Sequence, residues 1–218
     1  MRYGFLFLLL AVAIGITAFR GGLWMWLLFY PAFSFGVVAA AYLFSLPDLF
    51  GKRSDGRRSQ MGTLLVLPFL CYVSAVWHVV RLLSREPPTS KLNDDLMLSR
   101  RLLRKELPEG VASVVDLTCE FTEPKDGWDL QSYRCHPILD GTGSTSGEIR
   151  ELAIEITKMP KPVLIHCAQG HGRTGLVSAA VLIVSGEAGT ASEAIELIQA
   201  VRCGVKLNKA QREILGQI

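Results

Sequence analysis

Hydrophobic and polar positions divide this chain near residue 84. Three long apolar runs with almost no charge precede that point, at residues 5–19, 23–46 and 62–82. A transmembrane helix needs about 20 apolar residues, so the second and third runs are long enough to span a bilayer. The first run is shorter, and a signal peptide is the alternative interpretation. Because Gly21 and Gly22 favour a tight turn into the second run, we expect about three transmembrane helices within residues 1–83.

Beyond residue 90 the pattern changes to short apolar runs that alternate with amphipathic stretches. Strands are predicted at residues 96–98, 111–117, 133–139 and 162–165. Helices are predicted at residues 99–107, 145–158, 176–183, 190–201 and 208–218. Strands that alternate with helices indicate an α/β domain with a mostly parallel sheet, which we place at residues 91–218. Residues 84–90 contain two prolines and predict a short, semi-rigid linker.

Charge follows the same division. Residues 1–83 carry 7 Lys and Arg against 2 Asp and Glu, whereas residues 84–218 carry 16 against 18. The basic balance of the chain therefore belongs to its apolar part, and the composition gives no indication of a nucleic-acid partner. The cations that flank the apolar runs are instead typical of membrane-topology signals.

The sequence HCAQGHGRTG, residues 166–175, lies between a predicted buried strand and a predicted buried helix. A glycine-rich turn that leads into a helix N-terminus binds anions, because its N–H groups and the helix dipole point at one place. Cys167 is the candidate nucleophile, since a helix N-terminus and a nearby cation favour the thiolate. Arg173 is that cation, and its guanidinium can hold two phosphoryl oxygens at once. The candidate phosphate-binding residues are Ala168, Gln169, Gly170, His171, Gly172 and Arg173.

Two further residues of this stretch have expected supporting roles. Thr174 can donate a hydrogen bond to the Cys167 sulfur, and His166 can hold the turn from behind. The glycines at 170, 172 and 175 are expected to let the backbone curl around a tetrahedral dianion. The lysine of a nucleotide-binding loop is absent, which disfavours binding of a nucleoside triphosphate.

This stretch resembles the Cys-x5-Arg signature of cysteine-dependent phosphatases. Residues 91–218 resemble the dual-specificity branch of the protein-tyrosine-phosphatase-like superfamily. The resemblance implies a dual-specificity-phosphatase-like fold, with a central mostly parallel sheet flanked by helices, and here three transmembrane helices precede it. It also implies a covalent thiophosphate intermediate, a phosphomonoester substrate, and neither a metal nor a cofactor.

The resemblance further implies a general acid on an upstream loop, because the leaving oxygen must be protonated. Asp140 is the candidate, since it follows the extended stretch 133–139 in a strand–Pro–x–x–Asp pattern like that of the family. Asp129 and Asp126 are the alternatives. In the family a glutamine can help to place the hydrolytic water, and both Gln169 and Gln211 are available here.

Two basic segments of the sequence predict opposite orientations of the chain in the membrane. The loop between the second and third runs is basic, and the positive-inside rule would place it in the cytoplasm. The segment after the third run is also basic, although it lies across the membrane from that loop. An odd number of cysteines, with no zinc-ligand spacing, favours a reducing compartment. We therefore expect a multi-pass membrane protein whose catalytic domain faces the cytoplasm.

Three functions are compatible with these observations. The first is a phosphatase of a membrane lipid phosphate, with the basic helix at 99–107 resting on anionic headgroups through its four cations, Arg100, Arg101, Arg104 and Lys105. Ala168 stands where phosphoinositide phosphatases carry Lys, so a phosphatidylglycerophosphate-like lipid fits better than a highly charged phosphoinositide. The second is a phosphotyrosine or dual-specificity protein phosphatase that acts on membrane-proximal proteins. The third, a non-catalytic membrane scaffold, is disfavoured because nucleophile, arginine and acid are all present.

Overall fold

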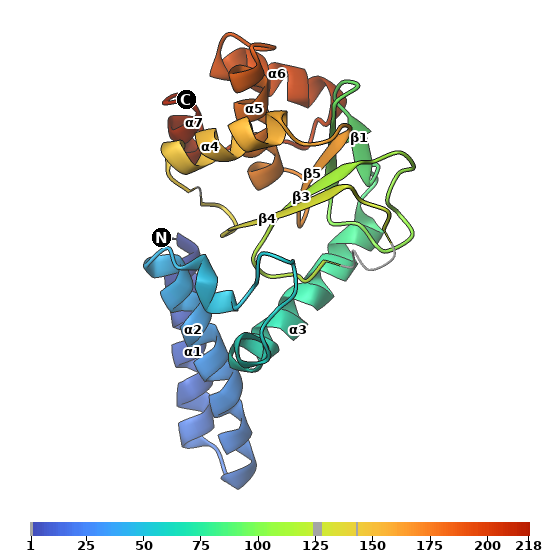
Figure 1. Cartoon of the computed structure of the whole chain (residues 1–218). Coiled ribbons are helices and arrows are strands. Elements are labelled where there is room, and N and C mark those ends of the chain that lie inside the picture. Colours follow the sequence, from blue (N-terminus) through green and yellow to red (C-terminus); the bar gives the residue numbers. More distant parts are fainter. Residues whose placement is uncertain (1, 124–127, 143) are drawn as a thin grey trace. The chain divides into compact units, whose positions relative to one another are not determined.

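The computed structural model describes residues 2–123, 128–142 and 144–218. The chain forms two compact units, which Figure 1 shows as a helical part and a part built on a sheet. The first unit comprises Met1–Ser84 together with Cys119–Thr122, and the second comprises Arg85–Thr118 and Glu123–Ile218. The longer segment of the first unit thus ends at Ser84.

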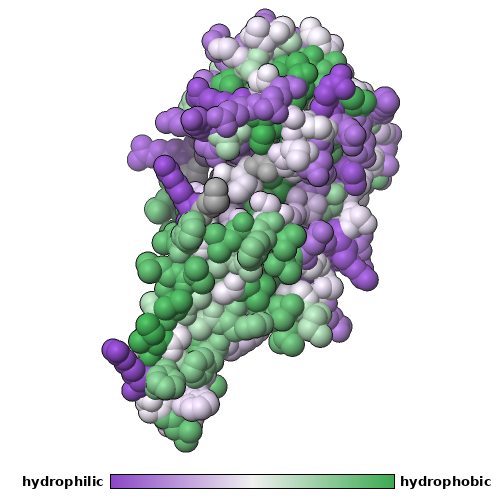
Figure 2. All heavy atoms as spheres, turned by 90° about the vertical axis from the view of Figure 1, so that its left-hand side faces the viewer, coloured by the Kyte–Doolittle hydropathy of each residue, from purple (hydrophilic) through white to green (hydrophobic). Residues whose placement is uncertain are grey.

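The first unit contains helices α1 (Arg2–Arg20), α2 (Phe29–Leu43) and α3 (Gln60–Leu83), with short 3-10 helices η1 (Leu23–Leu28) and η2 (Pro47–Phe50). Three helical segments are long and apolar enough to cross a membrane: α1, η1 with α2, and α3. Figure 2 shows hydrophobic side chains spread over the outer surface of these helices. Among the described residues of the second unit, only Leu197 and Val201 are exposed large hydrophobic residues.

Aromatic rings and one polar contact join the helices of the first unit. The Phe7 ring packs against those of Phe35 and Phe69, with centroids 6.1 and 5.4 Å away. Pro68 interrupts α3 and has no N–H to donate to the carbonyl of Leu64 one turn earlier. The hydroxyl of Tyr30 on α2 donates to that carbonyl instead. An apolar helix pair thus satisfies its own backbone, as a lipid environment requires.

The second unit is built on a five-stranded sheet in the order β1-β2-β5-β3-β4. Its strands are β1 (Thr89–Lys91), β2 (Leu96–Arg100), β3 (Ser113–Thr118), β4 (Ser132–Ile138) and β5 (Val163–Cys167). Its helices are α4 (Ser146–Thr157), α5 (Gly172–Ser185), α6 (Ala191–Val201) and α7 (Lys209–Leu215). Strand β1 is antiparallel to β2, and the other neighbouring strands are parallel. The predicted mostly parallel sheet is confirmed.

Alternate residues of the strands enter two separate cores, as the period of a strand requires. Leu98, Val115 and Ile165 pack with residues of α4, α5 and α6 in the larger core. Val114 and Leu164 point to the other face, where loop residues such as Leu102 cover them. The central strands are therefore buried on both faces, and their carboxyl ends lie together at one edge of the sheet.

One local prediction is wrong. Residues 99–107 form no helix, because Ser99 and Arg100 complete β2 and pair with His166 and Cys167 of β5. The Arg100 side chain is buried and donates to both carboxylate oxygens of Glu106, at 3.0 and 2.8 Å, so it is not available to lipid headgroups. The linker at residues 84–90 stays a prediction; the second unit begins at Arg85 and its first strand at Thr89.

Two helical glycines give matched tests of this packing. A methyl group at Gly175 of α5 would lie 2.5 Å from Cγ1 of Val205, whereas one at Gly147 of α4 would meet nothing. Gly175→Ala should destabilise the domain by about 1–3 kcal/mol through overpacking. Gly147→Ala should be neutral or stabilise it by up to ~1 kcal/mol. Thermal unfolding of the two variants in detergent checks the opposite signs, and equal shifts would contradict the packing described.

Candidate active site

The turn from β5 into α5 begins at Cys167, the last residue of the strand, and ends at Gly172, the first residue of the helix. Cys167 is 3% exposed. Gly170 has a φ of +71°, and a methyl group there would lie 2.5 Å from the carbonyl oxygen of Ser99 on β2. Only glycine fits this left-handed position against a neighbouring strand. Gly175 has a different role from the one expected, because it gives α5 room to pack on Val205.

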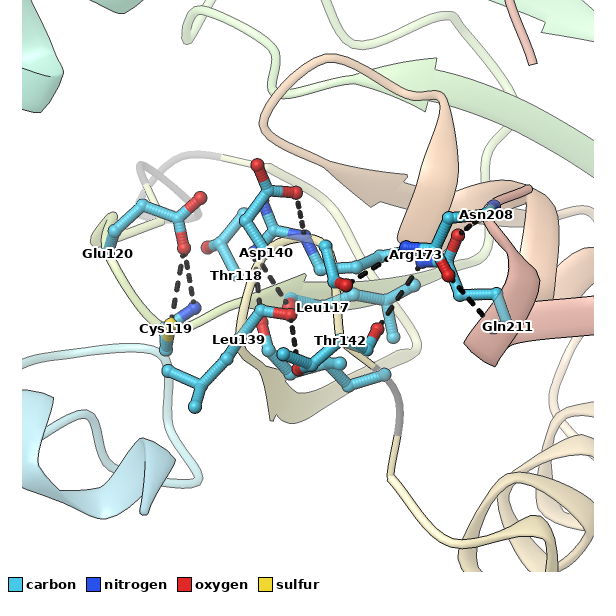
Figure 3. Close-up of polar contacts among 12 residues, drawn as sticks. Leu117, Thr118, Cys119, Glu120, Leu139, Asp140, Thr142, Arg173, Asn208 and Gln211 are labelled. Carbon is cyan, nitrogen blue, oxygen red and sulfur yellow. Dashed lines mark hydrogen bonds and ion pairs between the residues drawn. The ribbon is translucent and has the colours of Figure 1, made fainter. Parts of the chain in front are cut away.

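Arg173 lies at the carboxyl ends of β3 and β4 and is 1% exposed. Its Nη1 donates to the carbonyl oxygens of Ile138 at 3.0 Å and Leu117 at 3.5 Å. Its Nε lies 3.4 Å from Oδ1 of Asp140, as Figure 3 shows. The Asp140 side chain is 60% exposed. The fold thus brings the predicted arginine and the predicted general acid together, and it leaves the acid accessible.

The N-terminus of α7 holds the loop that carries Asp140 (Figure 3). Asn208 Nδ2 donates to the carbonyl of Gly141 at 2.9 Å, and Gln211 Nε2 donates to that of Thr142 at 3.3 Å. The Gln211 amide also lies against Gly172 of the candidate phosphate-binding turn. Of the two glutamines considered for placing water, Gln211 is therefore the one that touches both the acid loop and this turn.

The alternative acids are less well placed or not described. Asp129 lines a shallow surface depression with Arg104 and Trp128. Asp126 lies outside the described residues. The contact of Asp140 with Arg173 therefore favours Asp140 as the candidate acid.

Arg202, at the end of α6, is a functional residue that the sequence did not reveal. Its buried guanidinium donates to the carbonyls of Gly170 at 2.8 Å and Gln169 at 3.2 Å. It also donates to the carbonyl of Pro87 at 3.1 Å. Burial lowers the pKa of Arg202, and the nearby Glu86 carboxylate opposes that shift. No local pattern marks this residue, because its partners are distant in sequence.

His166 lies at the end of β5, among buried acidic groups. Its Nε2 is 3.4 Å from Oε2 of Glu123 and 3.8 Å from Oδ1 of Asp116. Burial, reinforced by the charge of Asp116, raises the pKa of Tyr133, and the Tyr133 hydroxyl donates to Oδ2 of Asp116 at 2.8 Å. In the described part of the chain, Asp116, Glu123 and His166 are the set whose ligand atoms lie close enough to hold a metal ion. Asp116 already accepts hydrogen bonds from Thr118 and Tyr133, which is typical of a structural network.

Thr174 is fully buried in the first turn of α5. Among the described residues its hydroxyl has no hydrogen-bond partner. The expected hydrogen bond from Thr174 to the Cys167 sulfur is therefore not formed in this arrangement.

The comparisons with known proteins agree with this geometry. A family model described as a polymorphic toxin system DSP-PTPase phosphatase matches residues 101–187, which include Cys167, Arg173 and Asp140. No curated protein sequence matches the chain. The solved structure of Tk-PTP in the active form is 27% identical, with a TM-score of 0.54, over 60% of this chain and 95% of that one.

Two further solved structures share the fold at lower identity. PTPMT1 in complex with PI(5)P is 18% identical, with a TM-score of 0.51, over 60% of this chain and 94% of that one. Human DUSP28 is 14% identical, with a TM-score of 0.52, over 61% of this chain and 93% of that one. The likeness in each case is confined to about three fifths of the present chain.

Arg202→Lys tests how the turn is held. A single ammonium cannot donate to the carbonyls of Gln169, Gly170 and Pro87 at once. The variant should bind orthophosphate or vanadate much more weakly, with a loss of roughly tenfold or more for a buried charge-assisted hydrogen bond. Isothermal titration measures this, and Arg150→Lys on the exposed surface of α4 is the control. Unchanged anion binding in Arg202→Lys would show that the turn does not depend on Arg202.

Proposed function

We propose that this chain, whose second unit is a phosphatase domain of the dual-specificity and protein-tyrosine-phosphatase superfamily, is a membrane-bound phosphomonoesterase that acts on lipid headgroup phosphates. One observation carries the proposal: a Cys-x5-Arg turn with an apposed acid follows three exposed apolar helices in the same chain. A protein phosphatase needs only one anchor to reach membrane-proximal substrates. Three candidate spans therefore favour a substrate that itself lies in the bilayer.

The first chemical step is transfer of the phosphoryl group to Cys167. The turn N–H groups and the N-terminus of α5 bind the phosphate dianion. The Arg173 guanidinium, whose Nη1 donates to the carbonyls of Leu117 and Ile138 before phosphate binds, turns to hold two phosphate oxygens. The Cys167 thiolate attacks phosphorus, a sulfur–phosphorus bond forms and the ester oxygen–phosphorus bond breaks. Asp140 gives its proton to the leaving alcohol oxygen. Bound phosphate competes with Asp140 for Arg173. The Asp140 side chain is then free to move toward the leaving group.

The second step returns the enzyme to its starting state. The Asp140 carboxylate takes a proton from a water molecule, and that water attacks phosphorus as the sulfur–phosphorus bond breaks. Gln211 is placed to orient the water, since its amide lies between the acid loop and the turn. The products are inorganic phosphate and the Cys167 thiolate. No step needs a metal ion.

The composition of the turn and the exposed cations of the second unit favour a singly phosphorylated lipid. Arg104 and Lys105 are exposed on the domain, and each adds about 1 kcal/mol of attraction near an anionic surface. Ala168 adds no charge to the turn, so a highly phosphorylated headgroup gains little there. A phosphatidylglycerophosphate-like lipid therefore fits better than a phosphoinositide. PTPMT1, which shares the fold, was solved in complex with PI(5)P.

The proposed orientation places the second unit in the cytoplasm. All five cysteines are free thiols, which suits a reducing compartment. The basic loop between α2 and α3 favours the opposite orientation. Its charge counts for less than its composition suggests, because Arg58 is hydrogen-bonded within the first unit. Its guanidinium donates to the carbonyls of Phe50 at 2.6 Å and Cys119 at 3.1 Å.

A phosphotyrosine or dual-specificity protein phosphatase is the second candidate. The observation in its favour is the identity of 27% with Tk-PTP, which is higher than that of 18% with PTPMT1. A non-catalytic scaffold stays disfavoured, because the fold brings Arg173 and Asp140 together beside the same turn as Cys167.

Asp140→Asn should reduce turnover by about 10²–10⁴-fold on substrates with poor leaving groups, the usual range for general acid–base catalysis. The loss should shrink for an activated aryl phosphate, whose leaving group needs little protonation. Asp129→Asn is the matched control and should keep the parent activity on both substrates. Steady-state kinetics of the two variants on alkyl and aryl phosphates make the comparison. A leaving-group dependence seen in Asp129→Asn instead would move the acid to Asp129.

The substrate class is tested with the full chain reconstituted in vesicles. We expect hydrolysis of phosphatidylglycerophosphate to exceed that of soluble phosphotyrosyl peptides by about 10²-fold or more, since enzyme and lipid share one surface. A singly phosphorylated phosphoinositide should lie between them. Cys167→Ser in the same vesicles controls for contaminating phosphatases. Efficient hydrolysis of phosphopeptides with no release of phosphate from either lipid would favour the protein-phosphatase function.

A further inference from the structure

A carboxylate from the segment that follows α3 reaches the candidate phosphate-binding turn. Glu86 Oε2 lies 2.6 Å from Nε2 of His171, the residue immediately before α5. The same oxygen lies 3.6 Å from Nη2 of Arg202. Glu86 also accepts a hydrogen bond from the backbone N–H of Gly204. One carboxylate thus joins the beginning of the second unit, the turn and the end of α6.

The site around this carboxylate is closely packed. A methyl group at Gly204 would overlap both the Glu86 carboxylate and the His171 ring. The side chains of Glu86 and His171 are 26% and 37% exposed, so the contact is partly shielded from solvent. Partial burial makes a charged hydrogen bond stronger than it is on an open surface.

Glu86 is charged at neutral pH. Burial by itself raises the pKa of this carboxyl, but the hydrogen bond and charge of His171, the charge of Arg202 and the Gly204 N–H together hold it below its usual value. A negative charge at this point balances the buried Arg202 guanidinium, which binds the turn carbonyls. The carboxylate therefore acts on the turn through two partners, Arg202 and His171.

His171 occupies a sensitive position in the turn. It precedes the first residue of α5, and its side chain does not cap the helix. Its backbone orientation sets the direction of the first helical N–H groups, which are those that bind an anion. A hydrogen bond that fixes the ring also restricts the backbone that carries it.

We propose that Glu86 is a positioning residue that fixes the phosphate-binding turn through His171 and Arg202. The inference rests on the proposed phosphatase function and deepens it, because it extends the active site to a residue outside 101–187, the residues that the family model matches. Glu86 follows the last residue of α3, Leu83, by three positions, which is a reach of about 10 Å.

The test uses the full chain in detergent, with orthophosphate and vanadate as the bound anions and an aryl phosphate as substrate. Glu86→Ala should weaken anion binding and lower kcat/KM by roughly tenfold or more, as for loss of a charge-assisted hydrogen bond. Glu86→Gln, which keeps an acceptor but not the charge, should recover part of this loss. Arg85→Gln alters the exposed neighbouring charge and should leave both quantities unchanged.

A double-mutant cycle separates positioning from general stabilisation. If Glu86 acts through His171, the losses in Glu86→Ala and His171→Ala should be strongly non-additive in anion affinity. Additive losses, or a Glu86→Ala variant that unfolds at lower temperature but keeps the parent anion affinity and kcat/KM, would overturn the inference. If the parent chain hydrolyses no phosphomonoester, the proposed function fails by itself. Anion titration of Glu86→Ala still decides the role of Glu86 in that case.

Discussion

A turn that binds an anion through its N–H groups needs hydrogen-bond donors behind it for its carbonyl groups. When successive N–H groups converge on one point, the carbonyls of the same residues face the interior, and they need donors there. Arg202 supplies those donors, because its buried guanidinium binds the carbonyls of Gln169 and Gly170. Its own charge needs a counterion, which Glu86 provides. The position of Cys167 relative to α5 depends on this arrangement.

A second arginine organises the opposite side of the site. Arg173 binds carbonyls at the ends of β3 and β4 and contacts Asp140. The α7 residues Asn208 and Gln211 then hold the loop after Asp140. Arg202 thus binds carbonyls behind the turn, and Arg173 binds a strand end beside Asp140. The candidate nucleophile ends β5 and the candidate acid follows β4, and the parallel sheet brings the carboxyl ends of these strands to one edge.

The sequence was sufficient for features that depend on local pattern. The apolar runs, the turn at residues 166–175 and the place of Asp140 after the fourth strand could all be predicted, because each is a contiguous signal. The helix expected at residues 99–107 was wrong, since pairing with β5 and the buried contact to Glu106 override its helical pattern. Arg202 and Glu86 could not be found, because their partners are far away along the chain. The grouping of Cys119–Thr122 with the first unit has no local signal either.

The central claim is that phosphate passes through the Cys167 sulfur, and trapping the intermediate tests it most directly. The full chain is mixed with a ³²P-labelled aryl phosphate and quenched in acid within the first turnover, and the labelled peptide is identified by mass spectrometry. The account predicts label on the peptide that contains Cys167, with the acid stability and iodine lability of a sulfur–phosphorus bond. It predicts no label in Cys167→Ser. Turnover without any label at Cys167, or label on a histidine or serine of the active parent chain, would contradict the account.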